Sequence, residues 1–159
     1  MNNVSIFVDV QNIYYTVKES YKSNFDYNTF WSKATYKRKV VKAIAYAIHS
    51  KDDKRKQFHN ILRGIGFEVK LKPFIQRSDG SAKGDWDVGI TLDVMEYAKV
   101  SDVVILASGD GDFDLLVNKA RNDFNIQVEV YGVMKLTAAS LIKSASRFIP
   151  IQDDLLLKK

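Results

Sequence analysis

The sequence predicts an α/β fold in three layers, in which a parallel β-sheet lies between helices on both of its faces. Segments typical of strands alternate with segments typical of helices along the whole chain, which is the pattern of a parallel sheet. Several strand segments are continuous apolar runs, as expected for strands buried on both faces. The chain has 159 residues, a length that suits one domain. We expect that domain at residues 1–150, followed by a short tail at residues 151–159.

The first strand is expected at residues 4–8, a run of β-branched, aromatic and other apolar side chains that ends in Asp9. A helix over residues 11–20 follows, and then a polar connection with several aromatic residues at 21–30. Residues 40–48 are apolar and small, and their periodicity fits either a strand or a helix. We favour a strand there because of the segments that surround it.

The middle of the chain continues the alternation. Residues 52–65 are predicted to form a helix, because Asp52 can cap its beginning and its apolar residues recur at helical spacing. Residues 67–75 alternate between apolar and charged side chains, which is typical of a strand. A polar loop with two glycines is expected at residues 76–84.

A further helix is expected at residues 85–98, where Val88, Leu92 and Met95 fall on one face. Residues 103–107 are a second strand segment made only of apolar residues. The remaining predicted elements are a helix at 112–121, a strand at 126–131, a short helix at 137–143 and an extended piece at 147–150.

Composition excludes several classes of protein. The chain has no cysteine, so disulfide scaffolds, cysteine-ligated zinc or iron–sulfur sites and cysteine nucleophiles are ruled out. Its beginning lacks the pattern of a signal peptide, and we therefore expect a cytoplasmic protein. No apolar stretch approaches the ~18 residues of a membrane span, so no membrane partner is expected.

The charge is divided unevenly along the chain. Residues 1–83 contain 16 Lys/Arg and 7 Asp/Glu, a net +9, whereas residues 84–159 contain 8 and 12, a net −4. A basic region suits a polyanionic partner, and an acidic region suits a cation. An uneven solvated surface would give the same division, so the motifs have to decide.

Acidic residues follow two of the predicted strands. Asp9 ends the first strand, and Asp110 and Asp112 follow the strand at 103–107. In a doubly wound sheet these strands are neighbours, and ligands bind outside their carboxyl ends. Asp87, in the first turn of its helix, can face the same edge. Carboxylates held together repel one another unless cations neutralise them, and oxygen ligands suit Mg²⁺ or Mn²⁺.

Each acidic residue also has a purely structural interpretation. Asp110 or Asp112 could cap the following helix, and Gly109 and Gly111 could be ordinary turn glycines. Asp93 is a poorer ligand candidate than Asp87, because six residues along a helix place it about 120° away and roughly 9 Å further along the axis. A hydrogen-bonding role suits it better.

Lys83 and Asn12 could support the acidic group, whereas the neighbouring Trp86 has a different interpretation. Lys83 could contact a phosphate or could be a solvated loop lysine. Asn12, one turn beyond Asp9, could orient a carboxylate, touch a phosphate or cap the helix that begins there. Trp86 is interpreted as a core or hinge aromatic.

Taken together, the motifs resemble a known family. The sequences DVQN at 9–12, KGDWD at 83–87 and SGDGDF at 108–113 look like the three motifs of the NYN domain, and more narrowly of its bacterial LabA-like branch, within the PIN-like nuclease superfamily. The resemblance covers nearly the whole chain. It implies a Rossmann-like PIN fold and a metal-dependent ribonuclease site. By position it implies an acidic, metal-binding catalytic set with two polar neighbours: Asp9, Asp87, Asp110 and Asp112, with Asn12 and Ser108 beside them.

The predicted activity is therefore metal-assisted hydrolysis of RNA phosphodiester bonds, with Mg²⁺ or Mn²⁺ as cofactor. Lys83, Asn12 and Ser108 are the expected substrate contacts. Single-stranded RNA is the expected partner, because basic groups at 37–42 and 51–56 lie near tyrosines in the sequence, a combination that suits phosphate contacts and stacking. Those basic groups could also be solvated helix faces, and some of the tyrosines must be core. The tyrosines concerned are Tyr14, Tyr15, Tyr36 and Tyr46.

Other functions remain open on the sequence alone. The main alternative is an RNA-binding or regulatory adaptor that keeps the fold but does not cleave. A phosphatase of the haloacid-dehalogenase type is disfavoured, because the first strand lacks the second acid of an Asp-x-Asp motif. A dinucleotide oxidoreductase is disfavoured by the absence of a Gly-x-Gly-x-x-Gly motif after the first strand. The sequence does not decide whether the chain forms a homo-oligomer.

Overall fold

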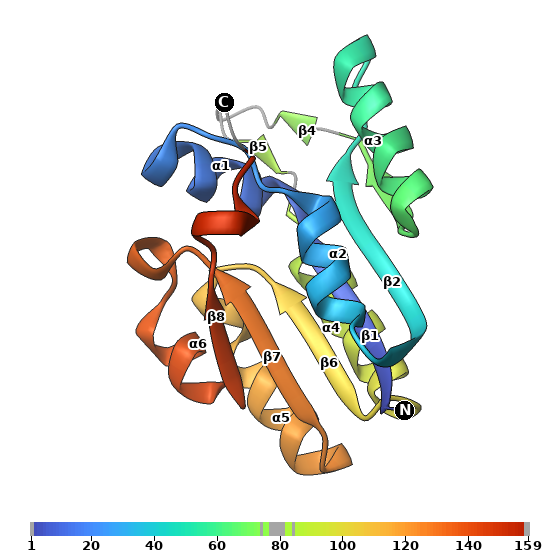
Figure 1. The fold of residues 1–159 in the computed structure, drawn as a ribbon, viewed down its shortest axis with the longest axis vertical. Coiled ribbons are helices and arrows are strands. Elements are labelled where there is room, and N and C mark those ends of the chain that lie inside the picture. The colour runs from blue at the N-terminus through green and yellow to red at the C-terminus, as the bar shows by residue number, and fades with distance from the viewer. Residues whose placement is uncertain (1, 74, 77–81, 84, 158–159) are drawn as a thin grey trace.

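The computed structural model describes residues 2–73, 75–76, 82–83 and 85–157. Its centre is a six-stranded sheet in the order β3-β2-β1-β6-β7-β8 (Figure 1). All five neighbouring pairs in this sheet are parallel. The strands are β1 (Asn2–Asp9), β2 (Arg38–Ile48), β3 (Glu68–Lys72), β6 (Val103–Ala107), β7 (Gln127–Gly132) and β8 (Arg147–Pro150). A separate antiparallel pair is formed by β4 (Ile75–Gln76) and β5 (Ala82–Lys83).

Helices cover both faces of the sheet, so the predicted three-layer α/β fold is confirmed (Figure 1). One face is covered by α1 (Val10–Tyr21), α2 (Tyr27–Thr35) and α3 (Asp53–Ile65), and the other by α4 (Asp87–Ala98), α5 (Asp114–Phe124) and α6 (Ala139–Ser144). Three short 3₁₀ helices are η1 (Gly111–Phe113), η2 (Met134–Leu136) and η3 (Asp153–Leu155). None of the described helices is long and apolar enough to cross a membrane.

The core consists of two apolar layers, one on each side of the sheet. In β1, Ile6 and Val8 pack into the layer beneath α1–α3, whereas Phe7 packs into the layer beneath α4–α6. Successive side chains of a strand point to opposite faces, so a strand between two helical layers needs apolar residues on both faces. This explains why the first strand does not alternate between apolar and charged residues; its one polar residue at 4–8, the buried Ser5, has a hydroxyl that hydrogen-bonds to that of Ser101 at 2.7 Å.

The strand order reverses between β1 and β6, which lie side by side with Val8 opposite Ala107. The expectation that these two strands are neighbours is thus confirmed. The strands that follow β1 in the sequence, β2 and β3, extend to one side, and β7 and β8 extend to the other. Such a reversal leaves a crevice at the carboxyl ends of the two central strands, where α/β proteins bind their ligands.

The connection expected at residues 21–30 contains the beginning of a helix, α2, which the sequence analysis missed. Asp26 caps it, with a side-chain oxygen that accepts a hydrogen bond from the Thr29 backbone N–H at 3.0 Å. Only Tyr27, Phe30 and Ala34 of this helix are buried. Three buried positions in a short, polar helix give too weak a periodicity to be recognised.

The buried face of α4 is not the face that carries Val88 and Leu92. Its buried residues are Ile90, Val94 and Ala98, whereas Val88 and Leu92 are 72% and 65% exposed. Val88 and Leu92, which the helical spacing places on one face, therefore lie on the solvent side of the helix. α4 carries apolar residues on more than one face, so periodicity alone could not tell which face would be buried.

Candidate functional site

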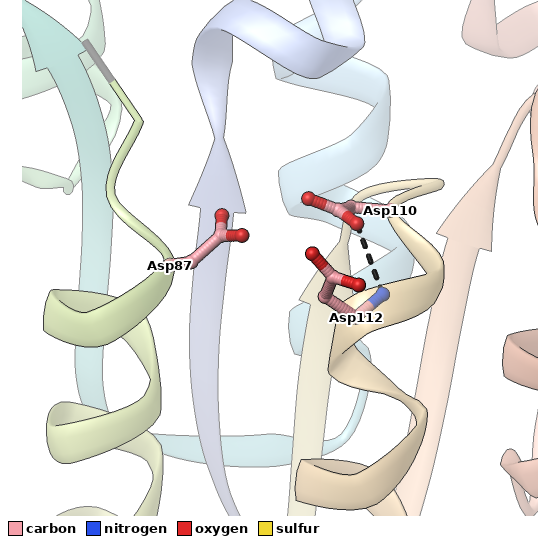
Figure 2. Close-up of side chains that lie close together, drawn as sticks. All are labelled: Asp87, Asp110 and Asp112. Carbon is pink, nitrogen blue, oxygen red and sulfur yellow. Dashed lines mark hydrogen bonds between the residues drawn. The ribbon is translucent and has the colours of Figure 1, made fainter. Parts of the chain in front are cut away.

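Three carboxylates meet at the carboxyl ends of β1 and β6. Asp87 is the first residue of α4, Asp110 precedes η1, and Asp112 lies within η1. One carboxylate oxygen of each lies within 4.8 Å of those of the other two. Figure 2 shows Asp87 extending from the beginning of α4 toward the loop after β6, from which Asp110 and Asp112 extend in return. The sequence predicted this convergence, and the structure brings these three residues together. We call Asp87, Asp110 and Asp112 the acidic cluster.

Asp110 has a second role in holding the loop after β6. Its side chain accepts a hydrogen bond from the Asp112 backbone N–H at 2.9 Å (Figure 2), which caps η1. The capping interpretation of Asp110 is therefore correct, and it is compatible with membership of the acidic cluster. A carboxylate has several acceptor positions, so one hydrogen bond from the backbone leaves others available to a cation.

Asp9 lies beside the acidic cluster and is buried at the end of β1. Its two oxygens accept hydrogen bonds from the Asn12 backbone N–H at 3.4 Å and from the Ser108 hydroxyl at 3.3 Å. Burial raises the pKa of the Asp9 carboxyl to about 6, against the lowering effect of these two hydrogen bonds. The group of three with mutually close oxygens does not include Asp9, and its role as a ligand stays a prediction.

Asn12 and Ser108 tie the loop after β6 to β1 and α1. The Asn12 side-chain oxygen accepts a hydrogen bond from the Gly109 backbone N–H at 2.9 Å. The fully buried Ser108 hydroxyl accepts one from the Asp110 backbone N–H at 3.2 Å. Asp9, not Asn12, caps α1. Both polar residues thus fix the position of the acidic cluster, whereas contact with a substrate stays a prediction.

The two glycines of the loop are placed where a side chain would have little space. Gly66 is the only described glycine with a positive φ, so neither Gly109 nor Gly111 needs the left-handed region. A Cβ on Gly109 would lie 2.9 Å from the Leu136 carbonyl oxygen, and one on Gly111 would lie 2.7 Å from the Ala138 Cβ. The interpretation of Gly111 as a turn residue agrees with its place in the single turn of η1, which the Phe113 N–H closes on the Asp110 carbonyl at 3.2 Å. The small size of both glycines lets the loop pack against the segment before α6.

Electrostatic repulsion is built into the acidic cluster. Burial and the nearby charges of Asp110 and Asp85 raise the pKa of the Asp87 carboxyl to about 7. Asp85 also raises the pKa of Asp9 slightly, so it lies close enough to act on both. The sequence analysis did not single out Asp85. The signal that could have found it is its place two residues before Asp87, in the same KGDWD motif.

Aromatic and basic side chains anchor the beginning of α4. The Trp86 indole N–H donates a hydrogen bond to the Ala47 carbonyl at 2.8 Å, and the Lys72 ammonium lies 4.4 Å from the centre of the Trp86 ring. The same ammonium donates to the carbonyl of Asp85. These contacts bind the residues just before Asp87 to β2 and β3, in agreement with the interpretation of Trp86 as a core or hinge aromatic.

Asp93 faces away from the acidic cluster, as its helical spacing predicted. It accepts hydrogen bonds from the buried Tyr46 hydroxyl and from the Lys70 ammonium, both at 2.8 Å. Asp93 thus links α4 to β2 and β3. Tyr46 belongs to the core and cannot offer aromatic surface to RNA, which corrects that part of the sequence analysis.

The two basic groups lie at opposite ends of the strand β2. Residues 37–42 lie at the amino end of β2, where Arg38 forms two hydrogen bonds with Glu129, at 3.0 and 2.8 Å, and Lys42 pairs with Glu68 at 3.0 Å. That group is remote from the acidic cluster. Residues 51–56 follow the carboxyl end of β2 and begin α3. Because α3 joins two parallel strands, its beginning lies at the same edge of the sheet as the acidic cluster.

The tyrosines divide in the same way. Tyr14 and Tyr15 lie in α1, just after Asp9, and are 47% and 55% exposed. Tyr36 is exposed but precedes the amino end of β2. The side chain of Lys83 lies outside the described residues, so its predicted contact stays a prediction. A cavity of about 700 Å³ between α2 and the strands β7 and β8 is lined by Tyr36 and by Arg38 of the basic group 37–42, and by no residue of the acidic cluster.

The acidic cluster suits a hard divalent cation. All its donors are carboxylate oxygens, the ligand type that Mg²⁺ and Mn²⁺ prefer. Burial first, and repulsion from Asp110 and Asp85 second, raise the pKa of the Asp87 carboxyl when no cation is present. A bound cation would remove that repulsion, and binding would release a proton from Asp87 at neutral pH.

Replacing Asp9 with asparagine is expected to change how the stability of the cation-free protein depends on pH. Because folding raises the Asp9 pKa from 3.8 to about 6, the charged form is disfavoured in the fold. Its cost is complete above pH ~6 and disappears as pH falls toward ~4. Asp9→Asn should therefore have the higher Tm at pH 8 in chelator, and this advantage should vanish near pH 4.

Thermal melts of both proteins across this range check that expectation. Burial lowers the pKa of His59, so protonation of His59 destabilises the fold as pH falls. This effect is the same in both proteins and therefore cancels in the difference between their Tm values. A Tm difference that stays the same at every pH would contradict the assignment.

Comparisons with known proteins agree with the geometry. A family model described as "NYN domain" matches residues 3–152. The low amplitude and bright protein LabA of Synechococcus elongatus is 23% identical over 161 residues, which cover 96% of this chain and 85% of LabA. A crystal structure of a protein of unknown function from Vibrio parahaemolyticus is 61% identical, with a TM-score of 0.94, covering 98% of this chain and 96% of that one.

Proposed function

The chain belongs to the NYN domain family, and from this membership and the site we propose that it is a metal-dependent ribonuclease that hydrolyses single-stranded RNA. The observation that carries the proposal is the acidic cluster, with an oxygen of each carboxylate within 4.8 Å of the others at the reversal of the strand order. Binding sites of α/β proteins occur at this place in the fold. In this proposal water is the nucleophile, and no side chain of the protein needs to act as one.

Asp87, Asp110 and Asp112 would hold the cation, with Asp9 as a further ligand or as a support behind them. When bound, a divalent ion would supply Lewis-acid activation of water and would offset the negative charge of the phosphate. Asp9 keeps the carboxyl end of β1 and the loop after β6 together through Asn12 and Ser108. The contacts of Trp86 hold Asp87 in place from the other side.

The RNA strand would be gripped at the carboxyl edge of the sheet. Lys51, Lys54, Arg55 and Lys56 are all exposed there at the beginning of α3, and the exposed rings of Tyr14 and Tyr15 lie in α1 at the same edge. Cationic side chains bind phosphates, and exposed aromatic rings stack on bases. Asn12, Ser108 and Lys83 are proposed to contribute at the cleavage site itself.

Replacing Lys54 and Lys56 with glutamine is expected to weaken RNA binding and to lower its salt dependence. Each lost phosphate contact on a single strand removes about 0.7 from the slope of log affinity against log salt, so the pair should remove about 1.4. Lys37→Gln with Lys39→Gln is the matched control, because it removes the same charge at the same spacing from the opposite edge. Fluorescence anisotropy over a range of salt measures both. Equal losses for the two pairs would contradict a grip at α3.

The proposal is tested with purified protein and a labelled single-stranded RNA, incubated with Mg²⁺ or Mn²⁺ and, in parallel, with chelator. We expect cleavage with the cation and none with the chelator. Metal-dependent binding without cleavage would favour the alternative, an RNA-binding adaptor. The absence of both would reject an RNA-related role for the acidic cluster.

A further inference from the structure

A small groove opens directly beside the acidic cluster, between α4 and η1. It encloses about 190 Å³ and is lined by Asp87, Val88, Thr91, Leu92, Asp112 and Phe113. Two of these residues, Asp87 and Asp112, belong to the acidic cluster. The groove and the acidic cluster are therefore one continuous surface, in which charged groups form one end and apolar groups the rest.

Two of the three apolar lining residues, Val88 and Leu92, are not part of the core, whereas the third, Phe113, is a buried core residue. α4 already buries Ile90, Val94 and Ala98 beneath it, whereas Val88 and Leu92 are 72% and 65% exposed. They are four residues apart, so they stand one above the other on the solvent side of the helix. Large apolar side chains gathered at a concave, exposed place beside a polar site are typical of ligand contacts.

The polar groups of the groove are largely occupied. The Thr91 hydroxyl donates a hydrogen bond to the Asp87 carbonyl at 2.7 Å, so it is already used within α4. What remains for an occupant, apart from the carboxylates at one end, is the apolar surface of Val88 and Leu92 beside the buried Phe113. Such a surface favours a flat group that buries its faces, and it offers little to distinguish one hydrogen-bonding edge from another.

We propose that this groove holds the base of the nucleotide adjoining the phosphate at the acidic cluster. The inference rests on the proposed ribonuclease function. When a phosphate of the RNA lies at Asp87 and Asp112, the base of the adjoining nucleotide is close enough to reach the groove, because these two residues also line it. Bases taken out of a stack pack between apolar side chains. Because the contact is apolar, the groove holds any base and does not select a sequence.

Replacing Leu92 with alanine tests this assignment. Two fluorescent oligonucleotides are used: a short single-stranded RNA, and the same ribose–phosphate chain with every base removed. Ca²⁺ takes the place of Mg²⁺ to limit cleavage, and gels verify that the RNA stays intact. We expect Leu92→Ala to bind the complete RNA about fivefold more weakly than wild type, as the loss of a partly buried side chain implies, and to bind the abasic chain as well as wild type.

Leu115→Ala is the matched control, because Leu115 is 77% exposed in the neighbouring α5 and does not line the groove. It should bind both oligonucleotides as wild type does. Unchanged Tm and Mn²⁺ binding of Leu92→Ala verify that the fold and the acidic cluster are intact.

The outcomes separate this inference from the proposed function. If wild type binds the complete RNA and Leu92→Ala binds it equally well, the base does not occupy the groove and the inference is wrong, while the ribonuclease proposal stands. Equal weakening for the complete and abasic chains would also reject it. If wild type binds no RNA, both fail. In that case, the exposed apolar residues of the groove are better explained as a contact for a side chain of a protein partner.

Discussion

Replacing Asp112 with asparagine is expected to reduce RNA cleavage by more than about 100-fold, since even residues that only support metal ligands commonly contribute 10- to 100-fold. Asp112 is the most exposed member of the acidic cluster, and asparagine keeps its size while removing its charge. The backbone N–H that bonds to Asp110 is unchanged. The variant should therefore fold normally and fail as a cation site, which single-turnover cleavage of labelled RNA with Mn²⁺ measures.

Asp114→Asn is the control for this prediction. Asp114 lies two residues further on, at the beginning of α5, and contributes no oxygen to the acidic cluster. It should cleave at nearly the wild-type rate. Wild-type cleavage by Asp112→Asn would show that the activity comes from another site or from a contaminating nuclease.

Replacing Asp87 with asparagine is expected to stabilise the cation-free protein and to abolish its stabilisation by Mn²⁺. Burial and the charges of Asp110 and Asp85 raise the Asp87 pKa to about 7, so its charged form opposes folding at pH 8. Removing the charge should raise Tm in chelator by about 2–4 °C, which corresponds to about 1 kcal/mol for a chain of this size. With Mn²⁺ the order should reverse, because only wild type gains binding energy.

Asp53→Asn provides the comparison for the Asp87 variant. Asp53 also lies in the first turn of a helix, α3, but is exposed and does not belong to the acidic cluster. Aspartate in a first turn normally stabilises a helix through its dipole, so Asp53→Asn should lower Tm slightly or leave it unchanged. Melts in chelator and in Mn²⁺ decide the matter. A lower Tm for Asp87→Asn in chelator would mean that Asp87 serves the helix and is not under repulsion.

The architecture could be predicted from the sequence because strands buried on both faces leave a strong signal. The runs at residues 4–8 and 103–107 correspond to β1 and β6, and their place in a doubly wound sheet follows from the alternation of strands and helices. The positions of Asp87, Asp110 and Asp112 followed in turn, since the ends of neighbouring parallel strands meet at one edge. The family model then agreed over residues 3–152.

What escaped prediction depends on contacts between distant segments. The exposure of Val88 and Leu92 is decided by which face of α4 meets the sheet, and that helix is apolar on several faces. The burial of Tyr46 depends on Trp86 and Asp93, which lie 40 and 47 residues away in the sequence. The separation of the two basic groups depends on the direction of β2, because the groups lie at opposite ends of the same strand.

The most direct test of the account is to locate the cation. Crystals of the protein soaked in Mn²⁺ would be measured at a wavelength where manganese scatters anomalously. The account predicts a peak bounded by Asp87, Asp110 and Asp112, and the loss of that peak in Asp112→Asn. A peak at another place in the molecule, or none at the acidic cluster under conditions in which the protein cleaves RNA, would contradict it.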